Sequence, residues 1–223
     1  LERLLSCHVP NSDVSRISGL SAGQTTVVAA ETFACLQIAL DVQRKTGGAF
    51  DVCYAAEHVG TAERFRLDPA RRTVQVLECG VRIDLGGIGK GFALDQMAAL
   101  LHEWDIAAAM LWASTSTVLA CGKPRPKHDW TVDFGPPGDR WQRAICGTAL
   151  SASGTAIKGE HIRDPRTGHT AGLRRSAWAA APTAAMADAL STAFMVMTQE
   201  ELRHCCQQDP QIAAYIPRAD GEL

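Results

Sequence analysis

Hydrophobic residues recur at helical spacing in several segments of the chain. In 27–48 and 89–106 the apolar positions fall on one helical face, and a glycine pair provides a stop for the first of these helices. Residues 184–197 are apolar almost throughout, with three polar interruptions. Residues 1–7 are typical of the end of a helix, and 13–17 of a short helical turn within a polar loop. The pattern therefore predicts three long helices and two short helical pieces.

Other segments carry the pattern of β-structure. Residues 64–85 predict a β-hairpin followed by a further strand, with the turn at 68–72. Residues 107–122 and 129–134 predict strands, and 147–154 a short strand that ends in a polar turn. Because the strands run in meanders mixed with helices, we expect an α+β fold rather than regular βαβ alternation.

Composition narrows the class of protein. The 223 residues are enough for one domain with a substantial core, or for two small subdomains, and no repeat or long linker divides them. We therefore expect a single domain over 1–223. Hydrophobic residues make up 46% and charged residues 21%, and the formal net charge is −2. No basic run points to a nucleic-acid partner, and no apolar stretch reaches membrane-spanning length. Oligomeric state cannot be predicted from these features.

The cysteines and the start of the sequence bear on the compartment. The eight cysteines are scattered and form no CxxC pair, which argues against a zinc site of the usual spacing. A reduced compartment fits them best, although an even number could also pair. The sequence begins at Leu1 without a signal-peptide pattern. The compartment is therefore unknown: periplasmic or membrane-associated if a signal or lipoprotein segment precedes Leu1, cytoplasmic otherwise.

The most distinctive stretch is VRIDLGGIGKGFALD, residues 81–95, with four glycines within six positions. It is not a P-loop, because Phe92 and Ala93 follow where Lys and Ser/Thr are required, and Phe92 also breaks the dinucleotide-binding pattern. Glycine lets a backbone approach another group closely. Two interpretations remain: a loop that holds phosphates, or a tight turn with packing glycines.

A second candidate lies in the apolar segment near the C-terminus. Asp188 and Thr192 are four positions apart and share one face of the predicted helix. A carboxylate and a hydroxyl are oxygen ligands suited to Mg²⁺, although a helical Thr often bonds back to a carbonyl instead. An unpaired carboxylate in this apolar helix would be costly.

Several motifs, in this order, resemble the ApbE family of FAD:protein FMN transferases. The motifs are DLGGIGKGFALD at 84–95, SASG at 151–154, HIRDPRTG at 161–168 and ADALSTAF at 187–194, with weaker likeness at 4–18 and 46–54. The resemblance covers nearly the whole chain. It implies an α+β fold in which mixed or antiparallel sheets and flanking helices surround an FAD-binding cleft.

The resemblance implies an activity and its partners. A Ser or Thr hydroxyl of an acceptor flavoprotein attacks the phosphorus on the FMN side of FAD, AMP leaves, and Mg²⁺ clamps the pyrophosphate. Two alternatives share these site residues: an FAD pyrophosphatase that uses water, and a flavin-binding paralogue without catalysis.

The resemblance also assigns residues. Asp188 and Thr192 match side-chain metal ligands, and the backbone oxygens of Gly87 and Ser191 match main-chain ligands. His161 is the candidate base, because imidazole can accept a proton near neutral pH. The alternative role of His161 is structural: a loop histidine that only orders a turn. The residues matched to FAD contacts are Ala49, Phe50, Asp51, Asp84, Lys90 and Ile162. For Asp84 the competing role is a turn cap, and for Lys90 a solvated side chain.

The sequence departs from the family in two places. Family members usually begin with an additional strand that contacts FAD, which this sequence does not show. In addition, Ser114 and Thr115 stand where the family often has glycines, and this substitution affects the expected shape of one wall of the cleft.

Overall fold

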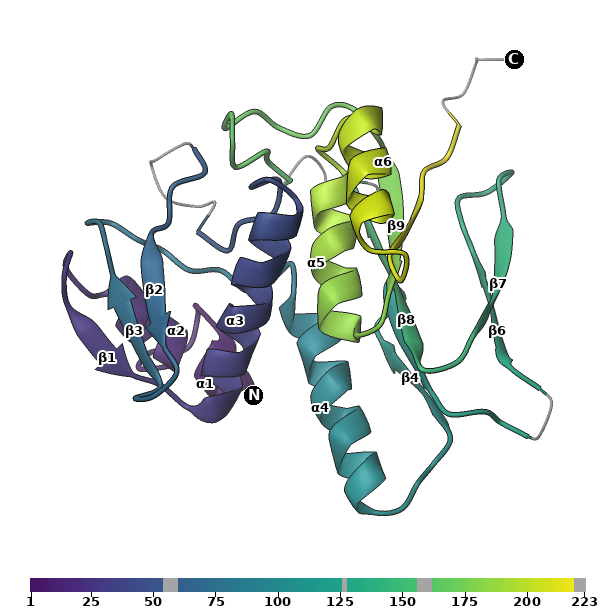
Figure 1. The fold of residues 1–223 in the computed structure, drawn as a ribbon, viewed down its shortest axis with the longest axis horizontal. Coiled ribbons are helices and arrows are strands. Elements are labelled where there is room, and N and C mark those ends of the chain that lie inside the picture. The colour runs from purple at the N-terminus through teal and green to yellow at the C-terminus, as the bar shows by residue number, and fades with distance from the viewer. Residues whose placement is uncertain (54–59, 126–127, 156–161, 219–223) are drawn as a thin grey trace.

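The computed structural model describes residues 1–53, 60–125, 128–155 and 162–218. Within them the chain forms helices and three antiparallel sheets (Figure 1). The helices are α1 (Glu2–Leu5), α2 (Asp13–Ser18), α3 (Ala30–Lys45), α4 (Gly89–Glu103), α5 (Ala184–Phe194) and α6 (Gln199–Gln208). The strands are β1 (Thr25–Val27), β2 (Phe65–Asp68), β3 (Thr73–Val76), β4 (Ala109–Ala113), β5 (Thr117–Cys121), β6 (Trp130–Phe134), β7 (Trp141–Ile145), β8 (Thr148–Gly154), β9 (Ser176–Ala181) and β10 (Ala213–Tyr215).

The sheets and helices are arranged in layers. A small sheet of order β1-β3-β2 lies on one side, and a five-stranded sheet of order β10-β9-β8-β5-β4 on the other. Helices α3, α4 and α5 lie between them, and the β6–β7 hairpin covers the far face of the larger sheet (Figure 1). The predicted α+β architecture with antiparallel sheets and flanking helices is confirmed.

Helix α5 packs closely against its neighbours because most of its side chains are small. Its alanines are fully buried, and the helix packs on α4 and on strands β8 and β9. The hydroxyl of Thr183 caps its N-terminus by accepting the N–H of Met186 at 3.2 Å. Asp95 of α4 accepts the N–H groups of Ala184 and Ala185, both at 2.8 Å. Burial raises the pKa of this carboxyl, while the two backbone N–H groups lower it.

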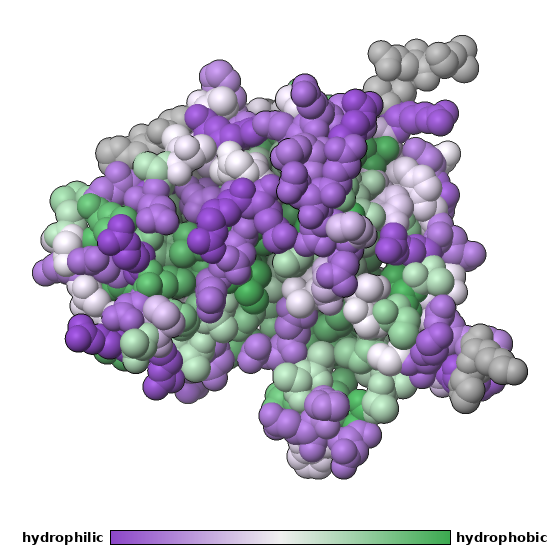
Figure 2. Space-filling view, viewed as in Figure 1, coloured by the Kyte–Doolittle hydropathy of each residue, from purple (hydrophilic) through white to green (hydrophobic). Residues whose placement is uncertain are grey.

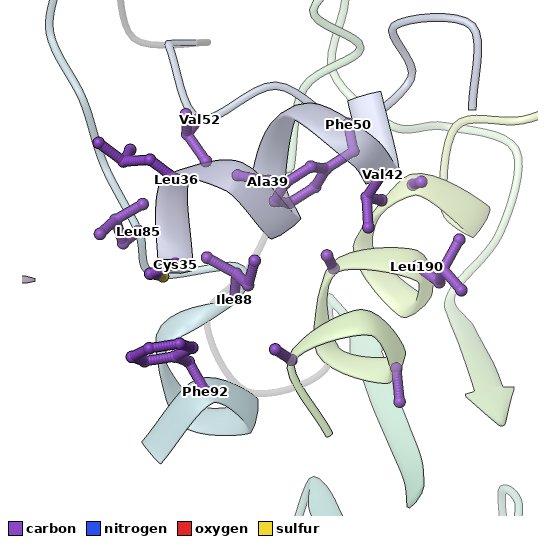
Figure 3. Packing of buried hydrophobic residues seen from close by; sticks show 14 of the residues in the cluster. Cys35, Leu36, Ala39, Val42, Phe50, Val52, Leu85, Ile88, Phe92 and Leu190 are labelled. Carbon is purple, nitrogen blue, oxygen red and sulfur yellow. The ribbon is translucent and has the colours of Figure 1, made fainter. Parts of the chain in front are cut away.

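The main hydrophobic core fills the space between the helices. Figure 3 shows side chains of α3, of the glycine-rich segment 86–91 (the glycine loop) and of α4 close together there, among them Leu36, Ile88 and Phe92, each fully buried. Leu190 of α5 belongs to the same buried cluster. Phe50, from the segment after α3, packs into the same cluster. The core therefore fixes the glycine loop and α5 relative to each other.

One face of the molecule is mostly polar. Hydrophilic residues cover most of the face drawn in Figure 2, with hydrophobic residues in patches between them. Among the helices that the structure describes, none has both the length and the apolarity to span a lipid bilayer.

Several predictions of local structure need correction. The strand predicted at the end of 64–85 does not form, because the N–H of Ile83 donates to the hydroxyl of Ser18 and that of Asp84 to the carbonyl of Val52. The helix predicted from residue 27 begins at Ala30, since Thr25–Val27 pairs with β3. Strands β7, β9 and β10 and helix α6 had no counterpart in the sequence-based prediction.

Gly91 accounts for the close approach of α4 to α5. A Cβ at this position would lie 2.0 Å from the carbonyl oxygen of Ala184. We therefore expect Gly91→Ala to force the two helices apart and to lower the free energy of unfolding by about 1–3 kcal/mol, the usual cost of overpacking. Urea denaturation followed by circular dichroism measures this change.

Gly89 is the matched control. A Cβ there meets nothing within 4 Å, and the residue begins the same helix. Gly89→Ala should leave stability unchanged or raise it by up to about 1 kcal/mol, because alanine favours helix. Equal losses in the two variants would contradict the packing role of Gly91.

Candidate functional site

A cleft of about 640 Å³ lies between the segment after α3, the glycine loop, the β4–β5 turn and the end of β8. This volume is within the range of small-molecule and cofactor sites. Most of the predicted site residues line it: Ala49, Phe50, Asp51, Asp84, Gly87, Lys90, Ile162 and Thr192. Segments that are far apart in the sequence are thus brought together at one site.

Asp188 and Ser191 lie behind this lining. Asp188 is 1% exposed and Ser191 is fully buried. Both come from α5, whose position is set by the core, and Thr192 from the same helix reaches the cleft itself. The predicted shared face of Asp188 and Thr192 therefore points toward the cleft wall.

The buried carboxylate of Asp188 has partners on both oxygens. The ammonium of Lys90 donates to Oδ1 at 2.9 Å and to Oδ2 at 3.2 Å. The N–H of Gly91 donates to Oδ2 at 3.1 Å, and the hydroxyl of Ser151 to Oδ1 at 3.2 Å. The cost expected for a carboxylate in this apolar helix is thus offset by an ion pair and hydrogen bonds.

Hydroxyl groups continue this polar cluster toward the cleft. The hydroxyl oxygen of Ser153 lies 2.9 Å from that of Ser191 and 3.1 Å from that of Thr192. Ser191 and Thr192 also donate to the main-chain carbonyl of Asp188, at 2.9 Å and 3.3 Å. The back-bonding predicted as the alternative for Thr192 is therefore present, but a hydroxyl that donates keeps lone pairs for a cation.

The glycine loop combines both of the interpretations that its sequence allowed. A Cβ at Gly87 would lie 3.2 Å from the ring of Phe50 and 3.4 Å from the hydroxyl oxygen of Thr192, so this backbone runs close to the cluster. Gly91 is a packing glycine. Asp84 is a turn cap, since its Oδ1 accepts the N–H of Gly86 at 2.7 Å, and it also lines the cleft.

Asp51 belongs to a buried ion pair at the edge of the cleft. Its Oδ2 lies 3.1 Å from the guanidinium of Arg64, and its Oδ1 accepts the N–H of Cys53 at 2.7 Å. Burial raises the pKa of Asp51, whereas the N–H of Cys53 and the charge of Arg64 lower it. These contacts fix the turn after Phe50, so Asp51 shapes the cleft as well as lining it.

His161 lies outside the residues that the structure describes, and its role stays a prediction. The loop that follows is well anchored: Asp164 accepts two side-chain bonds from Arg166, which also binds Glu201 of α6. Ile162 and Arg163 line the cleft. The anchoring therefore places the residues next to His161 at the cleft wall.

Several functional residues were missed by the sequence-based reasoning. Ser151 and Ser153 alternate along β8, so their shared face was a readable signal. No such signal marked Thr117 or Arg64. The hydroxyl oxygen of Thr117 lies 2.9 Å from that of Ser151. Trp178 lines the cleft and makes an edge-to-face contact with Trp141 of the β6–β7 hairpin.

Ser114 adopts a conformation that glycine favours. Its φ is +56°, in the left-handed region, and it lines the cleft together with Thr115. The turn therefore keeps a glycine-like backbone although the residue is serine, and both side chains add hydroxyl groups to this wall.

The donor set suits a hard cation. The described residues hold no group of three or more His, Cys, Asp or Glu side chains placed for a metal, so a site here relies on one carboxylate with hydroxyl and main-chain oxygens. Asp188 and Thr192 carry such oxygens on neighbouring turns of α5, and the backbone of Gly87 runs beside Thr192. Oxygen-only donors fit Mg²⁺ rather than zinc.

Comparison with known proteins identifies the family. Residues 1–216 match the ApbE family, and the chain belongs to it. The prediction of family membership is confirmed.

Individual relatives agree with this assignment. The FAD:protein FMN transferase of Treponema pallidum is 26% identical over a match that covers 96% of this chain and 72% of that protein. The protein of the same name from Klebsiella pneumoniae is 27% identical, over 63% of this chain but only 43% of its own length.

Solved structures show the same fold. The apo form of the flavinyl transferase ApbE from Pseudomonas stutzeri superimposes with a TM-score of 0.83 at 20% identity, covering 99% of this chain and 79% of that one. The ApbE protein of Thermotoga maritima gives a TM-score of 0.80 at 25% identity, covering 96% and 81%.

Proposed function

We propose that this chain transfers FMN from FAD to a serine or threonine hydroxyl of an acceptor flavoprotein and releases AMP. The observation that carries the proposal is the convergence of the family motifs on one cleft, where the buried Asp188 lies behind Thr192 and Lys90. The names of the curated relatives support the same activity.

Asp188, Thr192 and the backbone oxygens of Gly87 and Ser191 are the groups that would hold Mg²⁺. When bound, the ion supplies positive charge that stabilises the charge developing on a diphosphate during transfer. The chain's own contribution is to fix these oxygens: α5 is held by the core, and the hydroxyl of Ser153 ties Thr192 to β8.

The cleft walls offer complementary contacts for FAD. Phe50, Ile162 and Trp178 give apolar surface against which a flavin or adenine ring can pack. Lys90 and Arg163 bring positive charge to the same cleft, as a diphosphate requires.

The transfer itself exchanges the phosphoanhydride bond of FAD for a phosphoester bond to the acceptor. The acceptor oxygen forms a bond to the phosphorus on the FMN side, the bond from that phosphorus to the bridging oxygen breaks, and AMP leaves with that oxygen. The hydroxyl proton passes to a base, the role predicted for His161. Positioning and charge neutralisation supply most of the catalysis in reactions of this kind.

Release of AMP with and without an acceptor tests the proposal. The chain is incubated with FAD and MgCl₂, alone or with a purified acceptor flavoprotein whose serine or threonine hydroxyl does not yet carry FMN, and AMP is measured by chromatography. We expect AMP to appear only when the acceptor is present. Equal release without acceptor would instead identify an FAD pyrophosphatase, and no release in either case a flavin-binding protein without catalysis.

A further inference from the structure

The ion pair between Lys90 and Asp188 joins two of the predicted site residues directly. The two residues are 98 positions apart in the sequence, and the ammonium contacts both carboxylate oxygens. Of the described residues, Lys90 alone brings a cationic nitrogen within 4 Å of this carboxylate. Lys90 is therefore the source of positive charge beside Asp188.

Asp188 needs such a charge because it is almost completely buried. Its other partners, Gly91, Ser151 and Thr117, donate hydrogen bonds but carry no charge. A buried carboxylate without a cation is strongly disfavoured. Lys90 thus compensates the charge of Asp188 and helps to hold the carboxylate in place.

A metal ion at Asp188 would use the oxygens that Lys90 occupies. Metal binding and the ion pair are therefore in competition for one carboxylate. This competition lowers the affinity of the chain for the metal whenever Lys90 has no other anion to contact. Only the fraction of molecules with a free carboxylate then binds the metal readily.

Lys90 has an open route away from Asp188. Its side chain is 39% exposed, whereas that of Asp188 is 1% exposed. It also lines the cleft beside Gly87 and Thr192. The four-carbon stem of lysine is flexible, so the ammonium can turn from the carboxylate to the cleft without movement of α4.

We infer that Lys90 is a tethered counter-cation, which neutralises Asp188 when no metal is bound and shifts to the diphosphate of FAD when a metal takes its place. This inference rests on the proposed function. It makes the binding of metal and of FAD mutually favourable through one side chain, and such coupling is reciprocal by thermodynamic necessity.

Metal binding in the absence of FAD tests the inference without any transfer reaction. The probe is Mn²⁺, which accepts the same oxygen ligands and whose free concentration is read by electron paramagnetic resonance. Lys90→Met should bind Mn²⁺ more tightly than the wild type by a factor of about five or more, the lower end of typical coupling between sites. Lys90→Arg should bind Mn²⁺ more weakly than the wild type, because a guanidinium holds a carboxylate through two bonds.

Lys45→Met is the matched control. Lys45 pairs with Asp209 at 2.9 Å on the surface, and its side chain is 38% exposed, close to the value for Lys90. This variant should bind Mn²⁺ as the wild type does. If Lys90→Met does not fold, Lys90→Arg keeps the charge and still tests the direction of the effect.

FAD binding, followed by flavin fluorescence, gives the reciprocal measurement. Lys90→Met should weaken FAD binding when MgCl₂ is present and change it little in EDTA, where Lys90 stays with Asp188. Unchanged or weaker Mn²⁺ binding by Lys90→Met, or unchanged binding by Lys90→Arg, overturns the role of Lys90 but leaves the proposed function standing. A wild-type chain that binds no Mn²⁺ overturns both this inference and the magnesium site.

Discussion

Replacement of Asp188 by alanine is expected to abolish Mg²⁺-dependent FMN transfer, with a loss of about 10³-fold or more. Asp188 is the one side-chain carboxylate in the proposed ligand set, and backbone and hydroxyl oxygens alone hold Mg²⁺ poorly. A bound cation contributes several kcal/mol of charge stabilisation in the transition state, which converts to a loss of this size. FAD binding should weaken much less, because the apolar walls of the cleft remain. Flavinylation rates across a range of MgCl₂ concentrations measure the effect.

Asp209→Ala is the control for this variant. Asp209 also pairs with a lysine, but on the surface at the end of α6. The Asp209→Ala variant should transfer FMN at the wild-type rate. Because Asp188 is buried, the thermal melt of the Asp188→Ala chain is measured in parallel to show that this variant is folded. Normal turnover of a folded Asp188→Ala chain at modest Mg²⁺ would exclude this residue as a metal ligand.

Replacement of His161 by alanine is expected to slow transfer by about 10²–10⁴-fold, the usual contribution of a positioned general base. FAD and Mg²⁺ should still bind, because the imidazole would act on the acceptor hydroxyl and not on the cofactor. Titration of FAD by fluorescence and in-gel fluorescence of the acceptor measure the two effects separately. The wild-type rate should also rise with increasing pH, since only the neutral ring accepts a proton.

His169→Ala provides the comparison within the same loop. His169 is exposed, and its main chain, not its ring, holds the turn through the carbonyl that accepts the N–H of Asp164. It should leave the rate unchanged. A wild-type rate in His161→Ala would remove the residue from the role of base, and a complete loss of FAD binding would make it a cofactor contact instead.

Helical spacing of apolar residues predicted the long helices, although their burial differs: α3 buries one face, α4 buries residues near its start, and α5 buries nearly all of its residues. Helices α3, α4 and α5 fall within the predicted ranges, apart from small shifts at their ends. Strand β9 was missed for a physical reason: its sequence SAWAAA is rich in alanine, which disfavours strands, yet small residues suit a strand on which α5 packs. Helix α6 is polar, and its capping box, Thr198 with Glu201, was the available signal.

The site residues that belong to sequence motifs were predictable. Contacts that arise only from the packing of distant segments were not. The motif residues Phe50, Gly87 and Thr192 line one cleft, as expected from the resemblance. The ion pair of Lys90 with Asp188 depends on the packing of α4 against α5, which Gly91 allows. No local pattern reports a contact between residues so far apart in the chain.

Covalent attachment of FMN to an acceptor distinguishes transfer from FAD hydrolysis, and the intact mass of the acceptor measures it. The acceptor is incubated with FAD, MgCl₂ and either the wild-type chain or Asp188→Ala, then analysed by mass spectrometry under denaturing conditions. We expect the acceptor to gain the mass of one phosphoester-linked FMN with the wild-type chain and none with the variant. An acceptor of unchanged mass, while FAD is consumed by the wild-type chain, would contradict the proposed transfer.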